Sequence, residues 1–278
     1  MTESVRAAPV ALSTGADLDA ALDAGWLTVA YQPVLSLRSG AVVAAEALVR
    51  LQPPDGGLLA PDHFIPLAEA TGRVGRIDRM VLAEATGLAT SWRRDMGGRP
   101  FSIGVNLSVR SLSEAGLVDY IRTTCEQAHL PCDALVLEVT ETVLSEAGAG
   151  HDEVLQDIHA LGCNVTMDDF GTGYSSLEHL ARFPVDGIKI DRRFVWDIGR
   201  PGRAGLVPAA LVRLGRDLGM HVVAEGVETP EQLAALQDAG CPFAQGYLFS
   251  RPLPADQLTA YLRASGGGVP LPRSERRR

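Results

Sequence analysis

The chain has 278 residues, 46% of them hydrophobic, and a formal net charge of −9. This negative balance argues against broad binding of nucleic acid through its phosphates, so no DNA partner is expected. No apolar run reaches the ~20 residues of a membrane span, and residues 1–15 lack the basic patch and apolar stretch of a signal peptide. These features predict a cytoplasmic protein without a membrane segment.

Strand-like and helix-like segments alternate between about residue 27 and residue 263. Apolar patterning predicts strands over residues 26–37, 41–51, 101–107, 134–139, 163–167, 185–190, 221–224 and 242–249. It predicts helices over residues 16–24, 61–71, 76–94, 112–128, 152–161, 175–181, 206–218, 230–239 and 255–262. Because the linkers are short, residues 16–263 are expected to form one domain, between a flexible arm (residues 1–15) and a flexible basic tail (residues 264–278).

About eight strands over roughly 250 residues match the size of an α/β fold of the (β/α)₈ type, the TIM barrel. The first two strands are separated only by the turn Ser39-Gly40. A parallel crossover takes a dozen or more residues, so these two strands are expected to form an antiparallel hairpin. The predicted fold is therefore a variant TIM barrel whose first strand runs antiparallel to the others.

Polar side chains interrupt the apolar strands at or near their carboxyl ends. There are seven of them, each on a different strand: Glu46, Asn106, Glu138, Asp168, Lys189, Glu225 and Gln245. In a barrel these strand ends form one mouth, where active sites are built. Any one of them alone could equally be a helix cap or a solvated group, but seven in the same relative position favour a shared site.

Asp168 and Asp169 are adjacent carboxylates that follow a short apolar strand and precede a Gly/Ser/Thr-rich turn. Two such charges are costly to bury unless a cation neutralises them, and carboxylate oxygens are ligands that hard divalent metals prefer. An isolated Asp-Asp pair would more often cap a helix in water. Here, however, the formal charges of the candidate residues sum to −4, which two divalent cations would balance. The sum counts the ammonium of Lys189 against five carboxylates: Glu46, Glu138, Asp168, Asp169 and Glu225.

Lys189 is the only lysine among the 25 Lys and Arg residues, which suggests that a compact, titratable ammonium is needed at this place. A two-metal site suits hydrolysis of a phosphodiester by a water activated between the ions, and Lys189 would help to orient that water. Arg50 lies on the same strand face as Leu48 and could bind a phosphate with its forked guanidinium.

Seven short motifs occur in order along the chain: Glu46-Ala47-Leu48-Val49-Arg50, Asn106-Leu107-Ser108, Glu138-Val139-Thr140-Glu141, Asp168-Asp169-Phe170-Gly171-Thr172-Gly173, Lys189-Ile190-Asp191, Glu225-Gly226-Val227-Glu228-Thr229 and Gln245-Gly246. Together they resemble the ordered signature of the EAL-domain family, bacterial cyclic di-GMP phosphodiesterases, over essentially the whole chain. The resemblance implies a (β/α)₈ barrel with an antiparallel first strand and hydrolysis of cyclic di-GMP to linear pGpG. One departure, Leu51 after Arg50 where many relatives carry an aromatic residue, concerns packing and not the metal site.

The resemblance also implies a role for each matching residue. Two ions, Mg²⁺ or Mn²⁺, would be held by Glu46, Asn106, Glu138, Asp168, Asp169 and Glu225. The catalytic residues would be Lys189, which contacts the attacking water, Glu225, which completes the metal shell or acts as base, and Asp169. Cyclic di-GMP would contact Gln32, Leu48, Arg50 and Gln245. The loop that couples dimerisation to metal binding in this family would involve Glu141, Phe170, Gly171, Thr172 and Gly173.

Two other functions are compatible with the same pattern. The chain could be a catalytically silent cyclic di-GMP receptor that acts through a protein partner, although degenerate relatives of that kind lack metal-binding acids or the lysine, and this chain has all of them. It could also be a metal-dependent barrel hydrolase for another phosphodiester, which the order of the motifs disfavours. A homodimer is expected, and the same interpretation allows a regulatory protein partner.

Overall fold

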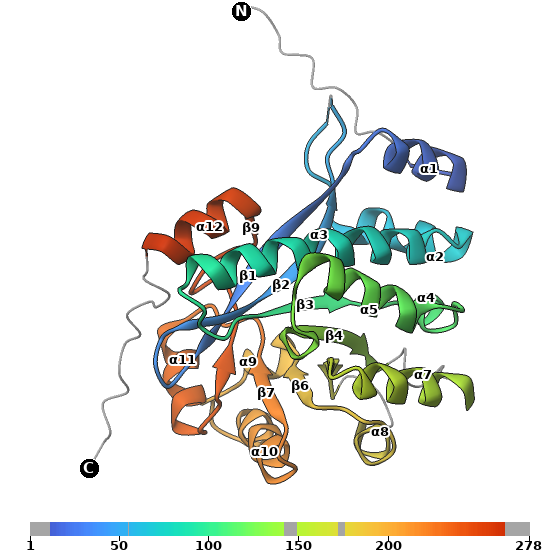
Figure 1. Cartoon of the computed structure of the whole chain (residues 1–278). Coiled ribbons are helices and arrows are strands. Elements are labelled where there is room, and N and C mark those ends of the chain that lie inside the picture. Colours follow the sequence, from blue (N-terminus) through green and yellow to red (C-terminus); the bar gives the residue numbers. More distant parts are fainter. Residues whose placement is uncertain (1–11, 55, 142–148, 172–175, 265–278) are drawn as a thin grey trace, which may run out of the picture.

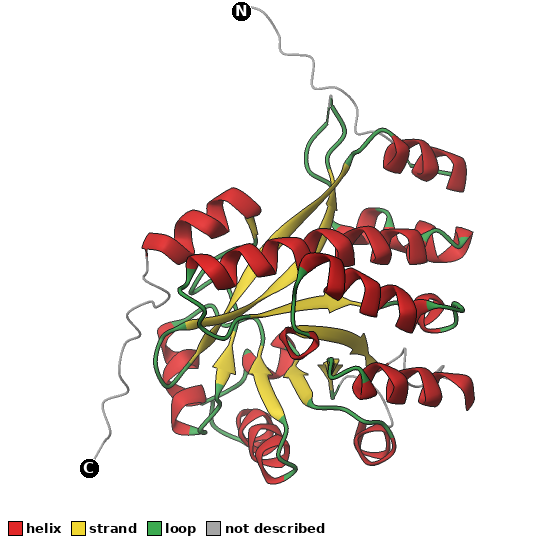
Figure 2. Cartoon of the chain, viewed as in Figure 1, coloured by secondary structure: helices red, strands yellow, loops and turns green. Residues whose placement is uncertain are grey.

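The computed structural model describes residues 12–54, 56–141, 149–171 and 176–264. Eight strands form a closed ring in the order β2-β3-β4-β5-β6-β7-β8-β1, and β9 is added at the edge of β1. Helices surround the ring, so that the strands lie inside and the helices outside (Figures 1 and 2). The predicted TIM barrel is confirmed.

The elements have the following bounds. The strands are β1 (Leu27–Ser36), β2 (Val42–Leu51), β3 (Ser102–Asn106), β4 (Leu135–Thr140), β5 (Asn164–Phe170), β6 (Gly187–Ile190), β7 (His221–Ala224), β8 (Phe243–Ala244) and β9 (Leu253–Pro254). The helices are α1 (Gly15–Asp23), α2 (Ile65–Thr71), α3 (Val74–Asp95), α4 (Val109–Leu112), α5 (Leu117–Ala128), α7 (Ala149–Ala160), α8 (Ser176–Arg182), α9 (Arg192–Val195), α10 (Arg203–Asp217), α11 (Pro230–Asp238) and α12 (Ala255–Ala264). Two short 3₁₀ turns are η1 (Pro61–His63) and η2 (Cys132–Ala134).

The first two strands form the antiparallel hairpin that the short turn predicts. Gln32 lies opposite Glu46, and the Ser36 N–H donates to the Ala41 carbonyl at 2.8 Å across the turn. β1 is also antiparallel to β8, whereas neighbouring strands from β2 to β8 are parallel. The expected antiparallel first strand is therefore confirmed.

The last barrel strand is shorter than the apolar pattern predicts. Residues 242–249 were expected to be a strand, but β8 covers only Phe243–Ala244. Gly246 packs directly against Val227, where a Cβ would lie 2.2 Å from the Val227 nitrogen, so the chain leaves the sheet at this glycine. It returns as β9, an unpredicted strand that pairs antiparallel with β1.

Other elements also differ from the prediction, and the helix expected over residues 61–71 is divided into η1 and α2. The helix expected over residues 112–128 begins only at Leu117, as α5, because Gly116 before it has a left-handed φ of 83°, and the short helix α4 ahead of it was not predicted. The single turn α9 was missed, since four residues are too few to show a helical period. β5 continues past its predicted end at residue 167 and includes both Asp168 and Asp169.

The outer face of the barrel is buried against the helices and holds the strands in place. Trp92 of α3 packs edge-to-face on Tyr31 of β1, with ring centroids 4.9 Å apart, and on Phe101, at 5.8 Å. Its indole N–H donates to Thr259 Oγ1 of α12 at 2.8 Å. Burial of large aromatic groups supplies much of the free energy that fixes the strands, and hence the side chains inside the ring.

The expected arm and tail fall mostly outside the described residues. Residues 12–14 are described and lead into α1, whose first turn is capped by the Thr14 side chain. Residue 264 is the last of α12, and the remainder of the expected tail is not described. Among the described residues, no helix combines the length and the apolar character needed to cross a membrane.

Candidate active site inside the barrel

One buried ammonium lies at the centre of the site. Lys189 Nζ is 3.0 Å from Glu46 Oε2, 2.9 Å from Glu138 Oε2, 3.1 Å from Asp168 Oδ2 and 2.8 Å from Glu225 Oε1. Only 2% of the Lys189 residue is exposed. Five of the seven residues predicted to share a site therefore meet around one atom.

Strand alternation explains how these side chains converge. Glu46 is on β2, Glu138 on β4, Asp168 on β5 and Lys189 on β6, and Glu225 directly follows β7. Successive residues of a strand point to opposite faces, so each of these residues faces inward while its neighbours pack against helices. Glu46 and Glu138 are both buried, and each is followed by further residues of its strand, so neither lies at the strand end itself.

Burial and mutual repulsion set the protonation of the cluster. Burial is the main cause that raises the pKa of Glu138 and of Glu225 well above the ordinary value, and neighbouring carboxylates add to it. Burial likewise raises the pKa of Asp168. Burial alone would raise the pKa of Glu46, but the Lys189 ammonium and the Gln245 amide lower it overall. Protons therefore compensate part of the negative charge that the single lysine cannot.

Lys189 itself stays charged. Burial disfavours its ammonium, but the carboxylates of Asp168, Glu138, Glu225 and Glu46 outweigh this effect and raise its pKa well above the ordinary value. The ammonium is consequently a fixed positive charge and a hydrogen-bond donor at neutral pH.

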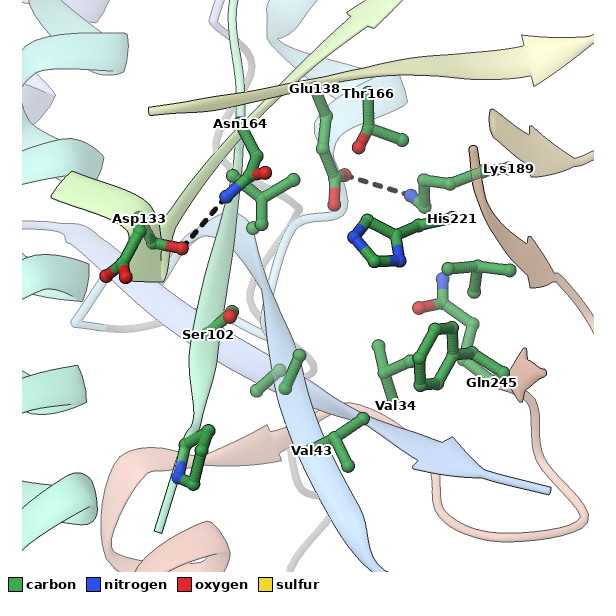
Figure 3. A pocket seen from close by; sticks show the side chains of 17 residues that line it. Val34, Val43, Ser102, Asp133, Glu138, Asn164, Thr166, Lys189, His221 and Gln245 are labelled. Atoms are coloured by element: carbon green, nitrogen blue, oxygen red, sulfur yellow. Dashed lines mark hydrogen bonds and ion pairs between the residues drawn. The ribbon is translucent and has the colours of Figure 1, made fainter. Parts of the chain in front are cut away.

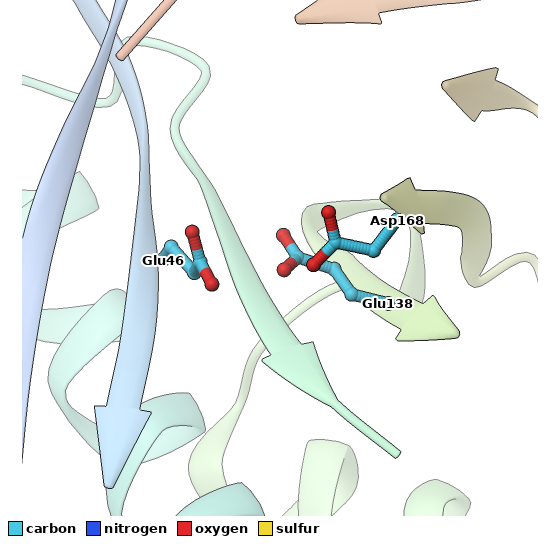
Figure 4. A group of neighbouring side chains, drawn as sticks. All are labelled: Glu46, Glu138 and Asp168. Carbon is cyan, nitrogen blue, oxygen red and sulfur yellow. The ribbon is translucent and has the colours of Figure 1, made fainter. Parts of the chain in front are cut away.

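Two groups of oxygens have the spacing to hold a metal ion. One is formed by Glu46, Glu138 and Asp168 and the other by Asp168, Asp169 and Glu225, and within each group the oxygens lie within 4.8 Å of one another. Figure 4 shows the three carboxylates of the first group facing a common space. Oxygen-only donor sets of this kind fit hard divalent cations such as Mg²⁺ or Mn²⁺, and Asp168 belongs to both groups.

A backbone bend lets two consecutive aspartates serve one site. Asp169 has a φ of 55°, in the left-handed region, and the pairing of β5 with β6 shifts register between Met167 and Phe170. In a regular strand Asp168 and Asp169 would point to opposite faces, and the bulge brings them to the same side. The Asp169 N–H also donates to Asp168 Oδ1 at 2.8 Å.

Asp191 is a neighbour that the sequence prediction did not include among the site residues. It follows β6 and hydrogen-bonds to Asp169, and burial together with Asp168 and Asp191 raises the pKa of Asp169 to about 6. Asp191 Oδ1 also accepts a hydrogen bond from Arg193 Nε at 2.8 Å. Its place directly after the strand of Lys189, within a motif already noted, was the signal that could have identified it.

Two amide side chains orient the carboxylates. Gln245 Nε2 donates to Glu46 Oε2 at 2.7 Å and to Glu225 Oε1 at 2.9 Å. Asn106 Nδ2 donates to Glu46 Oε1 at 3.2 Å. The remaining two of the seven predicted residues therefore also belong to the cluster.

Three of the four residues predicted to bind substrate lie on the two strands of the hairpin. Gln32 is directly opposite Glu46 and donates to the Ser250 carbonyl at 3.2 Å. Leu48 and Arg50 follow Glu46 at alternate positions of β2, and Arg50 Nη1 donates to the Val49 carbonyl at 2.7 Å. Their contact with a substrate stays a prediction.

The predicted loop anchor is described in part. Glu141 and Phe170 are buried, and Gly171 has a φ of 93° with Phe194 against it, so that a Cβ would lie 2.9 Å from that ring. Thr172 and Gly173 lie outside the described residues. The proposed coupling of this loop to dimerisation is untested.

Gly104 is a second residue whose importance the sequence did not reveal. A Cβ at this position of β3 would lie 2.2 Å from Glu138 Oε1. The glycine therefore creates the space that the Glu138 carboxylate occupies inside the ring.

Changing Gly104→Ala is expected to displace the Glu138 carboxylate, lower the free energy of unfolding by about 1–3 kcal/mol through overpacking, and weaken divalent-ion binding. Gly87→Ala is the matched control, because Gly87 lies in α3 and its added Cβ would meet nothing within 4 Å apart from the backbone of its own helix. Urea unfolding and calorimetric Mn²⁺ titration measure both effects. Unchanged stability together with unchanged Mn²⁺ affinity in Gly104→Ala would contradict the role of this glycine.

Comparison with known proteins is consistent with the site and the fold. The family model for the EAL domain matches residues 16–252. The chain is 44% identical over 254 residues to the cyclic di-GMP phosphodiesterase NbdA of Pseudomonas aeruginosa, covering 89% of this chain and 32% of NbdA. It is 37% identical to the cyclic di-GMP phosphodiesterase RocR of the same organism, covering 91% of this chain and 64% of RocR.

A solved structure supports the same relationship. The PaMucR phosphodiesterase in complex with c-di-GMP superposes with a TM-score of 0.81 at 40% identity, covering 87% of this chain and 98% of that one. The chain spans only about a third of NbdA and less than two thirds of RocR. The family model, the relatives and the fold agree. The chain therefore belongs to the EAL-domain family.

Proposed function

We propose that the chain hydrolyses one phosphodiester bond of cyclic di-GMP to give linear pGpG, with two divalent ions held by the carboxylates inside the barrel. The observation that carries the proposal is the position of Lys189 Nζ within 2.8–3.1 Å of four carboxylates, three of them on strands and the fourth directly after β7. The similarity to NbdA and RocR, both named cyclic di-GMP phosphodiesterases, and to the c-di-GMP complex of PaMucR supports the choice of substrate.

In this proposal the two oxygen groups each hold one ion. Glu46, Glu138 and Asp168 hold the first, and the Asn106 amide oxygen adds to them because its nitrogen is engaged by Glu46. Asp168, Asp169 and Glu225 hold the second. Bound Mg²⁺ or Mn²⁺ would lower the pKa of a water and offset the charge of the phosphate oxygens.

The protein groups position the reacting atoms. Lys189 donates a hydrogen bond to the attacking water, and Glu225, 2.8 Å from the ammonium, accepts the proton that the water loses. Gln245 holds Glu46 and Glu225 in place through its amide nitrogen. The water oxygen bonds to phosphorus, the bond from phosphorus to the 3′ oxygen breaks, and that oxygen takes up a proton to become the 3′ hydroxyl of pGpG.

The substrate enters from the carboxyl end of the barrel in this proposal. Arg50, two positions beyond Leu48 and four beyond Glu46, supplies a positive charge on the same face of β2. It binds a phosphate oxygen of the dinucleotide, and Gln32 on the paired strand supports the same region.

The direct test is incubation of purified full chain with cyclic di-GMP and Mg²⁺ or Mn²⁺, followed by chromatography. We expect pGpG to form and EDTA to suppress it. Binding of cyclic di-GMP without any product would instead favour the silent receptor, and hydrolysis of other phosphodiesters in preference to cyclic di-GMP would favour a hydrolase of different specificity.

Metal affinity is expected to increase with pH. The raised pKa values of Glu138, Asp168, Glu225 and, at about 6, Asp169 mean that an ion has to displace protons at low pH. Each displaced proton should cost about tenfold in affinity per pH unit below the pKa of its group. Calorimetric Mg²⁺ titration at pH 5.5, 6.5 and 7.5, in buffers of different ionisation enthalpy, measures both affinity and proton release.

The contribution of Asp169 can be separated in the same titration. Asp169→Asn removes the carboxyl whose pKa is about 6, so the number of protons released near that pH should fall by about one. A Mg²⁺ affinity that is the same at all three pH values, with no proton released, is incompatible with this assignment.

Homodimerisation, a regulatory protein partner and a cytoplasmic location remain predictions from the sequence. Sedimentation of the full chain with and without Mg²⁺ tests the first. A single monomeric species at all protein concentrations would contradict it.

A further inference from the structure

A chamber occupies the amino-terminal half of the barrel, on the other side of the carboxylate–lysine layer from the mouth. It has a volume of about 330 Å³. Glu138, Lys189 and Gln245 form its upper wall, on the side of the carboxylate–lysine layer. Its side walls are formed by residues nearer the amino ends of the strands, among them Ala44, Ser102, Val136, Asn164, Val223 and Phe243. Figure 3 shows these side chains arranged around an open centre.

This chamber is a departure from ordinary barrel packing. The interior of a TIM barrel is normally filled by layers of bulky branched side chains. Here three inward positions on adjacent strands carry small residues, namely Ala44 on β2 and Ser102 and Gly104 on β3. Protein interiors rarely leave voids much larger than a water molecule, so a space of this size requires an explanation.

Burial along the strands shows that the chamber is open to solvent. Val136 is partly exposed although it faces into the ring, whereas its neighbours Leu135 and Leu137 are buried against the outer layer. Val223 shows the same inversion between two buried neighbours. Pro100, Asp133 and His221 line the chamber and are exposed, which places its entrance at the amino ends of the strands.

The chamber also contains an unused acceptor. Gln245 Oε1 is buried and has no hydrogen-bond partner among the described residues, while its amide nitrogen is bound to Glu46 and Glu225. The oxygen is directed toward the chamber (Figure 3). Although the chamber is open, this oxygen is closed to solvent, so water does not satisfy it, and an acceptor without a partner costs about 1–3 kcal/mol. A ligand donor that reaches it after a small movement of the Gln245 side chain would therefore be favoured.

We propose that this chamber is a binding site for a small neutral molecule, mostly apolar and aromatic, that donates one hydrogen bond to Gln245 Oε1. Its volume lies in the range of small-molecule sites, and most of its lining surface is apolar, with the charged or titratable side chains at the entrance and on the upper wall. Phe243 offers an aromatic surface for a ring to pack against. A charged ligand would lose its hydration in this apolar space and is disfavoured.

Occupancy of the chamber is coupled to ion binding above it. Glu138, Lys189 and Gln245 form its upper wall and also belong to the cluster proposed to hold the ions. A ligand that touches their lower side changes the affinity of the cluster for Mg²⁺, and Mg²⁺ changes the affinity for the ligand by the same factor. This coupling rests on the proposed function, whereas the binding site itself does not.

The experiment uses indole, p-cresol and benzyl alcohol as probes of the full chain, detected by saturation-transfer NMR and titrated in Mg²⁺ and in EDTA. Ala44→Leu extends a side chain into the chamber, and Ala83→Leu makes the same change at an exposed position of α3. We expect at least one probe to bind the unmodified chain and Ala83→Leu equally, and to bind Ala44→Leu at least about tenfold more weakly, because the added atoms fill the site. Ser102→Val serves the same purpose if Ala44→Leu does not fold.

Failure of all three probes to bind, or equal binding by Ala44→Leu and Ser102→Val, would overturn the site. Dissociation constants in Mg²⁺ and in EDTA are expected to differ by about threefold or more, and identical values would overturn the coupling. Neither readout depends on turnover. Failure of the proposed binding site and failure of the proposed hydrolysis are therefore distinguishable.

Discussion

Asp168→Asn is expected to abolish hydrolysis of cyclic di-GMP while the fold stays intact. Asp168 is common to both oxygen groups, so its loss weakens both proposed ion sites, whereas Glu46 belongs only to the first. Turnover should fall by at least about a thousandfold, equivalent to about 4 kcal/mol of lost transition-state stabilisation. Metal stoichiometry should distinguish the two positions, with about one ion retained by Glu46→Gln and fewer by Asp168→Asn.

The stability of Asp168→Asn separates a functional from a structural effect. Burial raises the pKa of Asp168, so its charge is unfavourable in the ion-free protein, and a neutral amide of the same shape removes that cost. The free energy of unfolding in EDTA should therefore not fall by more than about 1 kcal/mol. Asp238→Asn, at the exposed end of α11, is the control. Retained metal-dependent turnover in Asp168→Asn would remove the basis of the two-ion assignment.

Lys189→Met is expected to affect stability and catalysis in different ways. In EDTA it leaves four carboxylates, three of them buried, without a counter-charge, and removal of one partner from a buried ionic cluster typically costs about 3–5 kcal/mol. The loss should be larger at pH 8 than at pH 6, because carboxyls with raised pKa values recover protons as the pH falls. Mg²⁺ should restore part of the lost stability.

Turnover of Lys189→Met should fall by about 10²–10³-fold even when Mg²⁺ is saturating, since the donor that orients the water is gone. The dissociation constant for cyclic di-GMP should change by less than about threefold, because the ammonium contacts carboxylates and not the substrate in the proposed arrangement. Lys189→Arg keeps the charge and should keep most of the stability, but its planar guanidinium cannot replace the point donor. Equal losses of binding and turnover would argue against a role in positioning water.

The inward-facing carboxylates could be predicted because they depend on local patterns. Glu46, Glu138 and Asp168 interrupt apolar strands, and strand alternation alone directs them to one face. The barrel followed from the number and spacing of the strands, and the antiparallel hairpin from the length of its turn. These features require no knowledge of which residues meet across the ring.

Features that depend on contacts between distant strands could not be predicted. Gly104 matters because of the Glu138 carboxylate on the next strand, and no local pattern marks it. The chamber arises from small residues on two adjacent strands, which in sequence are nearly sixty positions apart at Ala44 and Ser102. The early end of β8 depends on the contact of Gly246 with Val227.

The left-handed backbone of Asp169 places folding and function in opposition at a single position. A non-glycine residue in this region costs about 1–2 kcal/mol, and the buried carboxyl adds a desolvation cost. Asp169→Gly should therefore unfold at a higher temperature than the unmodified chain in EDTA, and that order should reverse in Mg²⁺. Selection of this protein for thermal tolerance alone, without selection for activity, would favour loss of this aspartate.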